Sequence, residues 1–364
     1  MKNAVVGVGR LGLPLLLNFD RFASGQWIGY DINLAHISDL NNKAFKSTED
    51  GVNDLLANTK CRFSSDIMDI LGAHTVFLAV RTNSLENGLY DVGNVFDFVN
   101  TLRDKLDSCR FSIKWLVINC NVNPGTSTAV SNLLKKYGID VCFWPEWVKQ
   151  GEIIKDQLHP PVHVLGVSDT AKDLDKLINL ISKIDQNELE TPKYQMSLIE
   201  AELTKVTLNC YLTVKISFAN MIGDMADQLG LDPNLILSAV GCDPRIGSRF
   251  FQPGSPYGGP CFPRDTKALL SFGSLFGIEL PIIKAAEEVN ALMMNKKKKE
   301  LFCLSRQSNE VKFENLDFKK GTYIYSGSPN LIVAQFLEQF GVKITVAPEF
   351  MDQMDMLNDN SATD

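Results

Sequence analysis

The sequence lacks features that would place it in several common classes of protein. No apolar run approaches the roughly 18 residues of a membrane-spanning helix, and the N-terminus enters a glycine-rich turn rather than a cleavable signal. The eight cysteines include no CxxC pair, which gives no support for a metal site and favours reduced thiols. A formal net charge of −7 argues against a general nucleic-acid binder. We therefore expect a cytoplasmic protein that binds no membrane, nucleic acid or metal.

The length of 364 residues exceeds what one small core can organise and predicts two or three domains. Up to about residue 190, short apolar runs alternate with helical patterns, which is typical of a parallel sheet covered on both faces. In this part we expect a helix at residues 11–22 and strands at residues 4–8, 26–32, 74–80, 114–119 and 162–166.

From about residue 196 the pattern becomes helical. Residues 199–229 carry apolar side chains at helical spacing without a proline, over about eight turns. A helix of this length is expected to link two domains or to form a dimer core, and further helices should begin at Asp232-Pro233 and Leu280-Pro281. The last part predicts one strand–helix–strand unit at 321–325, 330–339 and 342–346, then a disordered polar end at 358–364.

A glycine-rich turn follows the first predicted strand. Gly7, Gly9 and Gly12 fit G-x-G-x-x-G: the first permits the tight turn, the second the approach of a pyrophosphate, and the third close helix–strand packing. Asp31 ends the second predicted strand, 24 residues after Gly7, where a carboxylate binds ribose hydroxyls and repels the 2′-phosphate of NADP. A structural glycine turn is the alternative, but turn, helix N-terminus and acid together predict NAD.

A second informative stretch, YGGPCFPRD at residues 257–265, surrounds Cys261. Its two glycines and two prolines predict a rigid turn that can present the thiol to a ligand. Asp265 lies four residues after the cysteine and can return to the same site. A buried core cysteine is the usual alternative and accounts for most of the other seven, but a packing cysteine needs no such loop.

Four stretches in order resemble one family, the UDP-glucose 6-dehydrogenase and GDP-mannose dehydrogenase group. They are GVGRLGLP at 7–14, WPEWVKQGEIIKDQLHPPVHVLG at 144–166, AELTKVTLNCY at 201–211 and DPRIGSRFFQPGSPYGGPCFPRD at 243–265. The resemblance covers nearly all of residues 1–300. It implies an α/β protein with an N-terminal Rossmann-like NAD domain at 1–190, a helical central and dimerisation domain with the cysteine loop at 191–302, and a shortened C-terminal α/β segment at 303–364.

The resemblance also implies that Cys261 is the nucleophile of a four-electron oxidation. A sugar C6 alcohol loses a hydride to NAD, the aldehyde forms a thiohemiacetal, a second hydride leaves, and water hydrolyses the thioester. Lys205 and Asn209 lie four residues apart on one helix, where they would hold the alkoxide and the oxyanion. Without the family they would be interpreted as a solvated helix face. Glu146 would be the general base, and Asp265 would hold Lys205 or the attacking water.

The remaining binding residues are assigned by the same resemblance. Arg245 would reach the sugar of the neighbouring subunit, which implies at least a homodimer, and residues 250–254 with Gly258 would wrap the substrate. Residues expected to contact NAD are Gly7, Gly9, Leu11, Gly12, Asp31, Thr82, Asn121, Gln150 and Arg264. Residues expected to contact the nucleotide sugar are Glu146, Trp147, Gln150, Lys205, Asn209, Arg245, Phe250, Gly254 and Gly258.

The sequence departs from the family pattern at three places. Asn121 stands where the family has a threonine, although an amide still donates a hydrogen bond. Gln150 replaces a second acid, and because an amide cannot take a proton, any base role falls on Glu146 or Asp265. The C-terminal part lacks the family's nucleotide-binding stretches and ends after one strand–helix–strand unit.

UDP-glucose is the favoured substrate, because DQLHP at 156–160 resembles the short bacterial glucose type. Two alternatives stay open: a dehydrogenase for a UDP-N-acetylhexosamine, and a weakened NAD-binding homologue with an interaction role. An enzyme is favoured over a weakened homologue, because the sequence retains the residues with named catalytic roles, Cys261, Lys205, Asn209 and Asp265. The family implies a role in supplying precursors for a surface polysaccharide.

Overall fold

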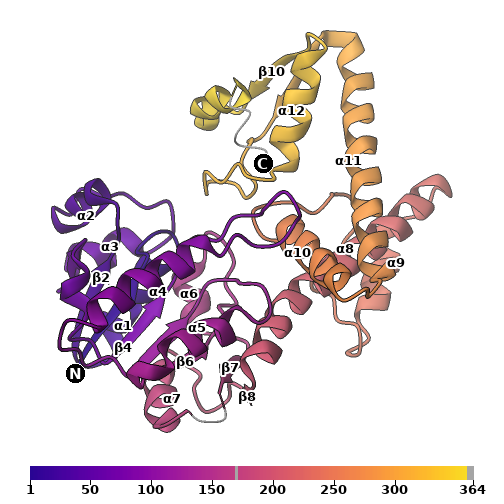
Figure 1. The fold of residues 1–364 in the computed structure, drawn as a ribbon. Helices are drawn as coiled ribbons and strands as arrows, with labels where there is room; N and C mark the ends of the chain where they lie inside the picture. The colour runs from indigo at the N-terminus through magenta and orange to yellow at the C-terminus, as the bar shows by residue number, and fades with distance from the viewer. Residues whose placement is uncertain (169–170, 359–364) are drawn as a thin grey trace. The chain divides into compact units, whose positions relative to one another are not determined.

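The computed structural model describes residues 1–168 and 171–358 (Figure 1). The chain divides into two compact units. The first comprises Met1–Glu86 and Tyr90–Lys205, and the second comprises Asn87–Leu89 and Val206–Asp364. Among the described residues, no helix combines the length and the apolar character needed to cross a membrane.

The first unit is built on an eight-stranded sheet in the order β3-β2-β1-β4-β5-β6-β7-β8. Neighbouring strands run parallel except for β6 and β7, which are antiparallel. All five strands that the sequence predicted for this part of the chain are present, with bounds shifted by a few residues. The strands are β1 Lys2–Val6, β2 Gln26–Tyr30, β3 Arg62–Ser64, β4 Thr75–Leu78, β5 Trp115–Ile118, β6 Asp140–Phe143, β7 His163–Val167 and β8 Lys193–Met196.

Helices cover both faces of this sheet, as the buried apolar runs predicted. Alternate residues of β1 face opposite sides: Ala4 and Val6 join one apolar cluster with side chains of α4 and α5, whereas Val5 joins a second with α1, α2 and α7. The helices are α1 Gly12–Phe22, α2 Leu34–Asn41, α3 Val52–Asn58, α4 Gly93–Leu106, α5 Thr126–Leu134, α6 Ile153–Leu158 and α7 Leu174–Ser182, with short 3-10 turns η1 Ile67–Ile70 and η2 Lys135–Tyr137.

Long helices dominate the part that follows. The predicted long helix is confirmed as α8 Leu198–Gln228, and the division between the two units falls within it. The predicted starts at Asp232-Pro233 and Leu280-Pro281 are also confirmed, because each proline occupies the first turn of its helix. The helices after α8 are α9 Pro233–Gly241, α10 Phe262–Leu275 and α11 Pro281–Ser308; α10 was not predicted.

The C-terminal part forms one parallel βαβ unit from β9 Glu310–Phe313, α12 Pro329–Gln339 and β10 Lys343–Val346, followed by the 3-10 segment η3 Pro348–Asn358. Met294, Leu301 and Phe302 of α11 pack against its apolar core, so the unit is covered by the rest of the chain. Residues 359–364 of the predicted polar end lie outside the described residues.

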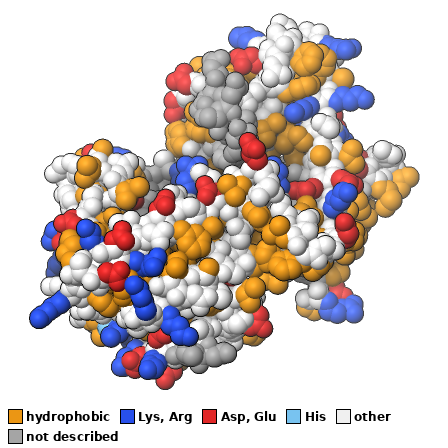
Figure 2. All heavy atoms as spheres, viewed as in Figure 1, with side chains coloured by type: hydrophobic (Ala, Val, Ile, Leu, Met, Phe, Trp, Pro, Cys, Tyr) orange, Lys and Arg blue, Asp and Glu red, His pale blue; other side chains and the backbone are white. Residues whose placement is uncertain are grey.

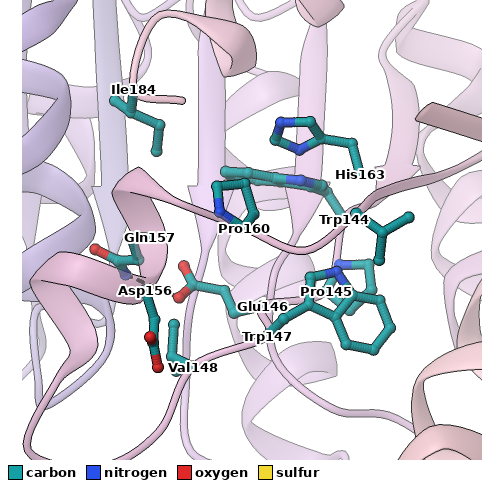
Figure 3. Close-up of a pocket in the computed structure, with 11 residues that line it drawn as sticks. Trp144, Pro145, Glu146, Trp147, Val148, Asp156, Gln157, Pro160, His163 and Ile184 are labelled. Atoms are coloured by element: carbon teal, nitrogen blue, oxygen red, sulfur yellow. Dashed lines mark hydrogen bonds between the residues drawn. The ribbon is translucent and has the colours of Figure 1, made fainter. Parts of the chain in front are cut away.

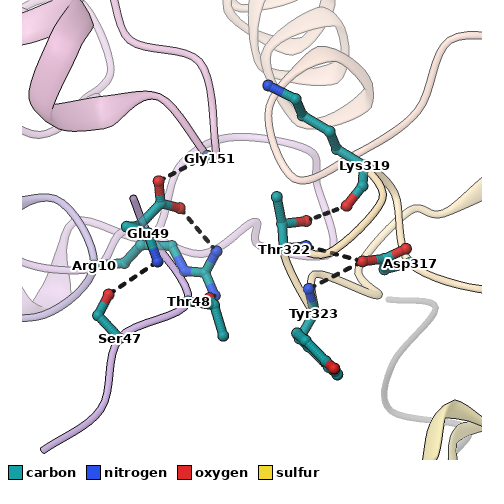
Figure 4. A network of polar contacts seen from close by, with 9 residues as sticks. All are labelled: Arg10, Ser47, Thr48, Glu49, Gly151, Asp317, Lys319, Thr322 and Tyr323. Carbon is teal, nitrogen blue, oxygen red and sulfur yellow. Dashed lines mark hydrogen bonds and ion pairs between the residues drawn. The ribbon is translucent and has the colours of Figure 1, made fainter. Parts of the chain in front are cut away.

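The prediction of a strand at residues 321–325 was wrong. This segment is a turn around Asp317, whose Oδ2 accepts the backbone N–H groups of Thr322 and Tyr323 at 3.0 and 3.1 Å (Figure 4). Tyr323 has a φ of +54°, which no regular strand accommodates. A carboxylate that binds successive amides stabilises a turn over an extended strand, and the first strand of the βαβ unit is β9 instead.

Candidate active site and cofactor site

The glycine turn between β1 and α1 has the geometry of a phosphate-binding loop. Gly7 has a φ of +84°, and a Cβ on Gly12 would lie 2.0 Å from the carbonyl oxygen of Gly7. A Cβ on Gly9 would meet no atom within 4 Å, so this side of the turn is open to a ligand. Leu11 occupies the N-cap of α1 without a side-chain hydrogen bond, and the positive end of the helix dipole lies at this turn, where it favours a bound anion.

Three further predicted cofactor residues follow the carboxyl ends of parallel strands of this sheet. Asp31 follows β2, Thr82 follows β4 and Asn121 follows β5, while the strand order reverses between β1 and β4. In open parallel sheets, ligands bind at such a reversal. Thr82 donates its hydroxyl to the carbonyl oxygen of Asn121 at 2.8 Å, which joins two of these loops. The residues present therefore fit a dinucleotide.

A buried carboxylate that sequence analysis missed links the glycine turn to a later loop. Arg10, inside the turn, lies 3.2 Å from Oε1 of Glu49, and Oε2 of Glu49 accepts the N–H of Gly151 at 2.7 Å (Figure 4). The Glu49 side chain is 2% exposed. Gln150 directly precedes Gly151, so this network fixes the loop that carries it. Nothing in the local sequence around Glu49 signals a contact with residues this distant in the chain.

Glu146 lies after β6 in a buried position beside a small pocket (Figure 3). Its Oε2 accepts the side-chain N–H of Gln157 at 2.8 Å, and its backbone oxygen accepts Nζ of Lys205 at 2.7 Å. Burial raises the pKa of Glu146 to about 7, while the Gln157 hydrogen bond and the Lys205 charge act in the lowering direction. Lys205 also lies 4.8 Å from the ring centre of Trp147. Three of the predicted residues thus meet in the first unit.

Cys261 directly precedes α10 and is half-buried. The turn before it requires its glycines, because a Cβ on Gly258 would lie 2.3 Å from the carbonyl oxygen of Gly327, and Gly259 has a φ of +78°. This confirms the predicted tight turn, although the helix begins already at Phe262. A thiol at a helix N-terminus is in an environment that favours the reactive thiolate.

Asp265 is fully buried on the first turn of α10 and meets the long helix. Its Oδ2 accepts the amide N–H of Asn209 at 2.6 Å, and its backbone oxygen accepts Sγ of Cys210 at 3.4 Å. Its Oδ1 lies 3.2 Å from Nε of Arg264, a residue expected to contact NAD. The structure therefore brings together two of the predicted site residues, Asn209 and Asp265, in a contact that the sequence did not predict.

Residues expected to wrap the substrate lie around the loop between α9 and α10. Arg245 is 86% exposed and its guanidinium binds Asp243, with the nearest N···O distance 2.6 Å. Phe250 has a φ of +59° and is 41% exposed. Gly254 donates its N–H to Oδ1 of Asn220 at 2.9 Å. Within the second unit, Arg245 and Phe250 are thus available to a ligand or a neighbouring molecule.

Two buried polar side chains of α8 were missed by sequence analysis. Glu202 accepts the N–H groups of Gly125 and Ser127 at 2.6 and 2.7 Å, and so caps α5. Asn220 binds two consecutive residues of the loop between α9 and α10, since it accepts the N–H of Gly254 and donates to the carbonyl oxygen of Ser255 at 2.8 Å. Polar residues at helical spacing among apolar ones are the sequence signal, although the pattern does not name their partners.

Comparisons with known proteins agree in family and fold. Residues 1–187 match the model of the UDP-glucose/GDP-mannose dehydrogenase family, NAD binding domain, and residues 199–292 match that of its central domain. The UDP-glucose 6-dehydrogenase TuaD of Bacillus subtilis is 28% identical over 355 residues, which cover 94% of this chain and 75% of that protein. The GDP-mannose 6-dehydrogenase of Azotobacter vinelandii is 29% identical over 338 residues, which cover 88% of this chain and 74% of that protein.

A solved structure is similar over the whole chain. The UDP-glucose dehydrogenase of the hyperthermophilic archaeon Pyrobaculum islandicum superposes with a TM-score of 0.85 at 25% sequence identity. The match covers 100% of this chain and 85% of that one. The shared fold therefore extends through the C-terminal βαβ unit.

Proposed function

Because the chain belongs to the UDP-glucose/GDP-mannose dehydrogenase family of NAD-dependent oxidoreductases, we propose that it oxidises the C6 alcohol of UDP-glucose to the carboxylate of UDP-glucuronate. The family matches confirm the resemblance, the fold class and the NAD cofactor that the sequence predicted. The particular sugar and the role of Cys261 are our proposal.

NAD would be held by the residues at the reversal point of the sheet. The open side of Gly9 and the positive end of the α1 dipole would bind the pyrophosphate, and Asp31 would bind the ribose. When bound, NAD supplies the acceptor for hydrides that leave the sugar carbon. Thr82 and Asn121 belong to the loops at the same edge of the sheet.

The hydrogen bond between Asn209 and Asp265 is the observation that carries the catalytic proposal. It ties the predicted oxyanion donor to the helix whose N-terminus bears Cys261. An amide nitrogen has two N–H donors. Asn209 can therefore bind Asp265 with one N–H and a substrate oxygen with the other. Lys205 donates Nζ to the backbone oxygen of Glu146 at 2.7 Å, which places its ammonium group beside the proposed general base.

We propose that the Cys261 thiolate attacks the aldehyde carbon that the first oxidation produces. A C–S bond forms, and the carbonyl electron pair moves onto oxygen, where Lys205 and Asn209 stabilise it. The second oxidation converts this adduct to a thioester. Water then attacks, its proton passes to Glu146, the C–S bond breaks, and the thiolate is restored.

Stoichiometry tests this proposal. The protein is incubated with NAD and a panel of UDP- and GDP-sugars, and NADH formed per sugar consumed is counted. Two NADH per UDP-glucose, with UDP-glucuronate as product, support the proposed reaction. A preference for a UDP-N-acetylhexosamine would change the substrate and keep the chemistry. No NADH with any sugar would contradict the proposed activity and favour an interaction role.

We also propose that the chain forms a homodimer through α8. Tyr211, Phe218, Met221 and Met225 recur at helical spacing and are between 46% and 63% exposed. Hydrophobic side chains gather on the visible surface of α8 and α9 (Figure 2). A second copy of the chain would cover this apolar face. Sedimentation of the protein at micromolar concentration tests this, and a monomer would contradict it.

A further inference from the structure

Two buried amide side chains connect the dinucleotide-binding helix to Glu146. Gln157, on α6, donates Nε2 to Oε2 of Glu146 at 2.8 Å and accepts Nδ2 of Asn18, on α1, at 2.9 Å. Asn18 is 0% exposed and Gln157 is 6% exposed. Buried side-chain amides are costly unless they are hydrogen-bonded, and a connected row of them strongly restricts its own geometry.

The direction of both amides is set by the backbone. Nε2 of Gln157 lies 3.4 Å from the carbonyl oxygen of Leu11, and Nδ2 of Asn18 lies 3.4 Å from that of Ile154. A carbonyl oxygen only accepts hydrogen bonds, so each amide must turn its nitrogen toward it. Gln157 therefore presents a donor to Glu146 and cannot present its oxygen instead. If Oε2 of Glu146 carried a proton, its O–H would face the N–H of Gln157, and two donors would oppose each other.

The second carboxylate oxygen has a different environment. Oε1 of Glu146 is buried and accepts no hydrogen bond from the described residues. Glu146 and Gln157 line a pocket of about 20 Å³, enough for one water molecule (Figure 3). The charged or titratable groups around Glu146 are Lys205 from α8 and, in the pocket wall, Asp156 from α6 and His163 from β7. Burial lowers the pKa of His163, which favours its neutral form.

We infer that Gln157 is a positioning residue for the general base: its amide, oriented by Asn18 and two backbone carbonyls, holds Oε2 of Glu146 as an acceptor and directs proton transfer to Oε1. The inference rests on the proposed function in one respect, the assignment of Glu146 as the base of thioester hydrolysis. In that step an O–H bond of water breaks and its proton passes to Oε1. The interaction with Gln157 favours the carboxylate, which is the form that can accept this proton.

Infrared difference spectroscopy of the protein without substrate tests the inference directly. Near neutral pH few carboxyl groups are protonated, and the C=O band missing from Glu146→Gln identifies that of Glu146. We expect this band to titrate near pH 7 in the wild type. In Gln157→Leu the midpoint should rise by roughly one pH unit, because a donor to the carboxylate is lost.

Two further variants separate positioning from packing. Gln157→Glu keeps the shape of the side chain, and its added carboxylate should also raise the midpoint. Val162→Ala alters the lining of the same pocket while Gln157, the donor to Glu146, stays in place, and should leave the midpoint unchanged. Equal midpoints in the wild type, Gln157→Leu and Gln157→Glu would overturn the inference, as would a Val162→Ala shift as large as theirs.

Turnover provides a separate readout. In Gln157→Leu the acid limb of the kcat profile for acid formation should move to higher pH by the same amount as the infrared midpoint, with the KM for UDP-glucose unchanged. If the wild type forms no NADH with any sugar, the proposed function fails, while the infrared titration still decides whether Gln157 controls Glu146. A KM change at a constant pH profile would contradict the positioning role.

Discussion

The amide nitrogen of Asn209 and a carboxylate oxygen of Asp265 are 2.6 Å apart, one on α8 and the other on the first turn of α10. This contact fixes both the orientation of the Asn209 amide and the direction of its second N–H. Asn209→Ala should lower kcat about 10²-fold through loss of an oxyanion donor. It should also lower stability by about 1–3 kcal/mol, because the buried Asp265 loses a hydrogen bond. Steady-state kinetics and denaturant unfolding measure both effects; unchanged kcat would contradict the proposed role.

Cys261→Ala should abolish acid formation and leave NAD binding intact. The thiol is the proposed point of attachment, whereas the glycine turn belongs to the first unit of the chain. Product analysis and calorimetric titration with NAD measure the two properties. Cys242→Ala and Cys303→Ala replace exposed cysteines and serve as matched controls that should retain full activity. Continued acid output from Cys261→Ala would refute the nucleophile.

Glu146→Gln should stall the reaction after the second oxidation. The isosteric amide cannot accept the proton of the attacking water, so hydrolysis should slow about 10²-fold or more. A covalent adduct should then accumulate on Cys261, visible by mass spectrometry of the intact protein. A variant that turns over at the wild-type rate would show that the base lies elsewhere.

The same carboxyl should make stability depend on pH. Its pKa is raised on folding, so the folded state binds the proton more tightly than the unfolded state does. Its contribution to stability is therefore fully present at low pH and is lost as the pH rises from about 4.5 through 7. The free energy of unfolding of Glu146→Gln minus that of the wild type should therefore increase as the pH rises from about 4.5 to 7, and should stay constant above pH 7. Unfolding curves from pH 5 to 9 measure the difference, and a constant difference would contradict the prediction.

Alanine at two glycines of the cofactor turn should affect different properties, stability at Gly12 and NAD binding at Gly9. Gly12→Ala places a Cβ 2.0 Å from a backbone oxygen and should destabilise the fold. Gly9→Ala places its Cβ in open space, so the melting temperature should hold while NAD binds about 10-fold or more weakly, because the methyl group occupies the approach of the pyrophosphate. Thermal melts and calorimetry distinguish them; tight NAD binding by Gly9→Ala would place the pyrophosphate elsewhere.

Subunit mixing tests the role proposed for Arg245. If this arginine reaches the site of a neighbouring subunit, a mixture of Arg245→Ala and Cys261→Ala should recover part of the activity that each lacks alone. In a mixed dimer, one site combines an intact cysteine with an intact arginine from the other copy. No recovery in verified mixed dimers would indicate that Arg245 acts within its own subunit or not at all.

Sequence patterns predicted those elements whose structure depends on residues close together in the chain. The buried strands, α8 and the Gly7–Gly12 turn follow from apolar periodicity and from glycine conformations. The helix α10 was missed because the glycines and prolines around Cys261 indicate a turn, although proline in a first turn starts a helix. Strand β8 was missed because its first three residues are exposed and give no alternating pattern.

Within the candidate site, the family pattern named residues for each proposed role, whereas it did not name the side chains that hold them in place. Glu49, Glu202 and Asn18 act on residues more than 70 positions away or through a second side chain, and such partners leave no periodic signal. Gln157 lies in the DQLHP stretch, which gives no sign of the partner of its side chain. Only the packing of α6 against α1 reveals that it touches Glu146.

The C-terminal part of the chain contacts the loop that precedes Cys261. The carbonyl oxygen of Gly327 accepts the N–H of Gly259, two residues before Cys261, and leaves no room for a side chain on Gly258. Deleting all residues after 302 would therefore remove Gly327, and with it a backbone hydrogen bond that holds the loop before Cys261.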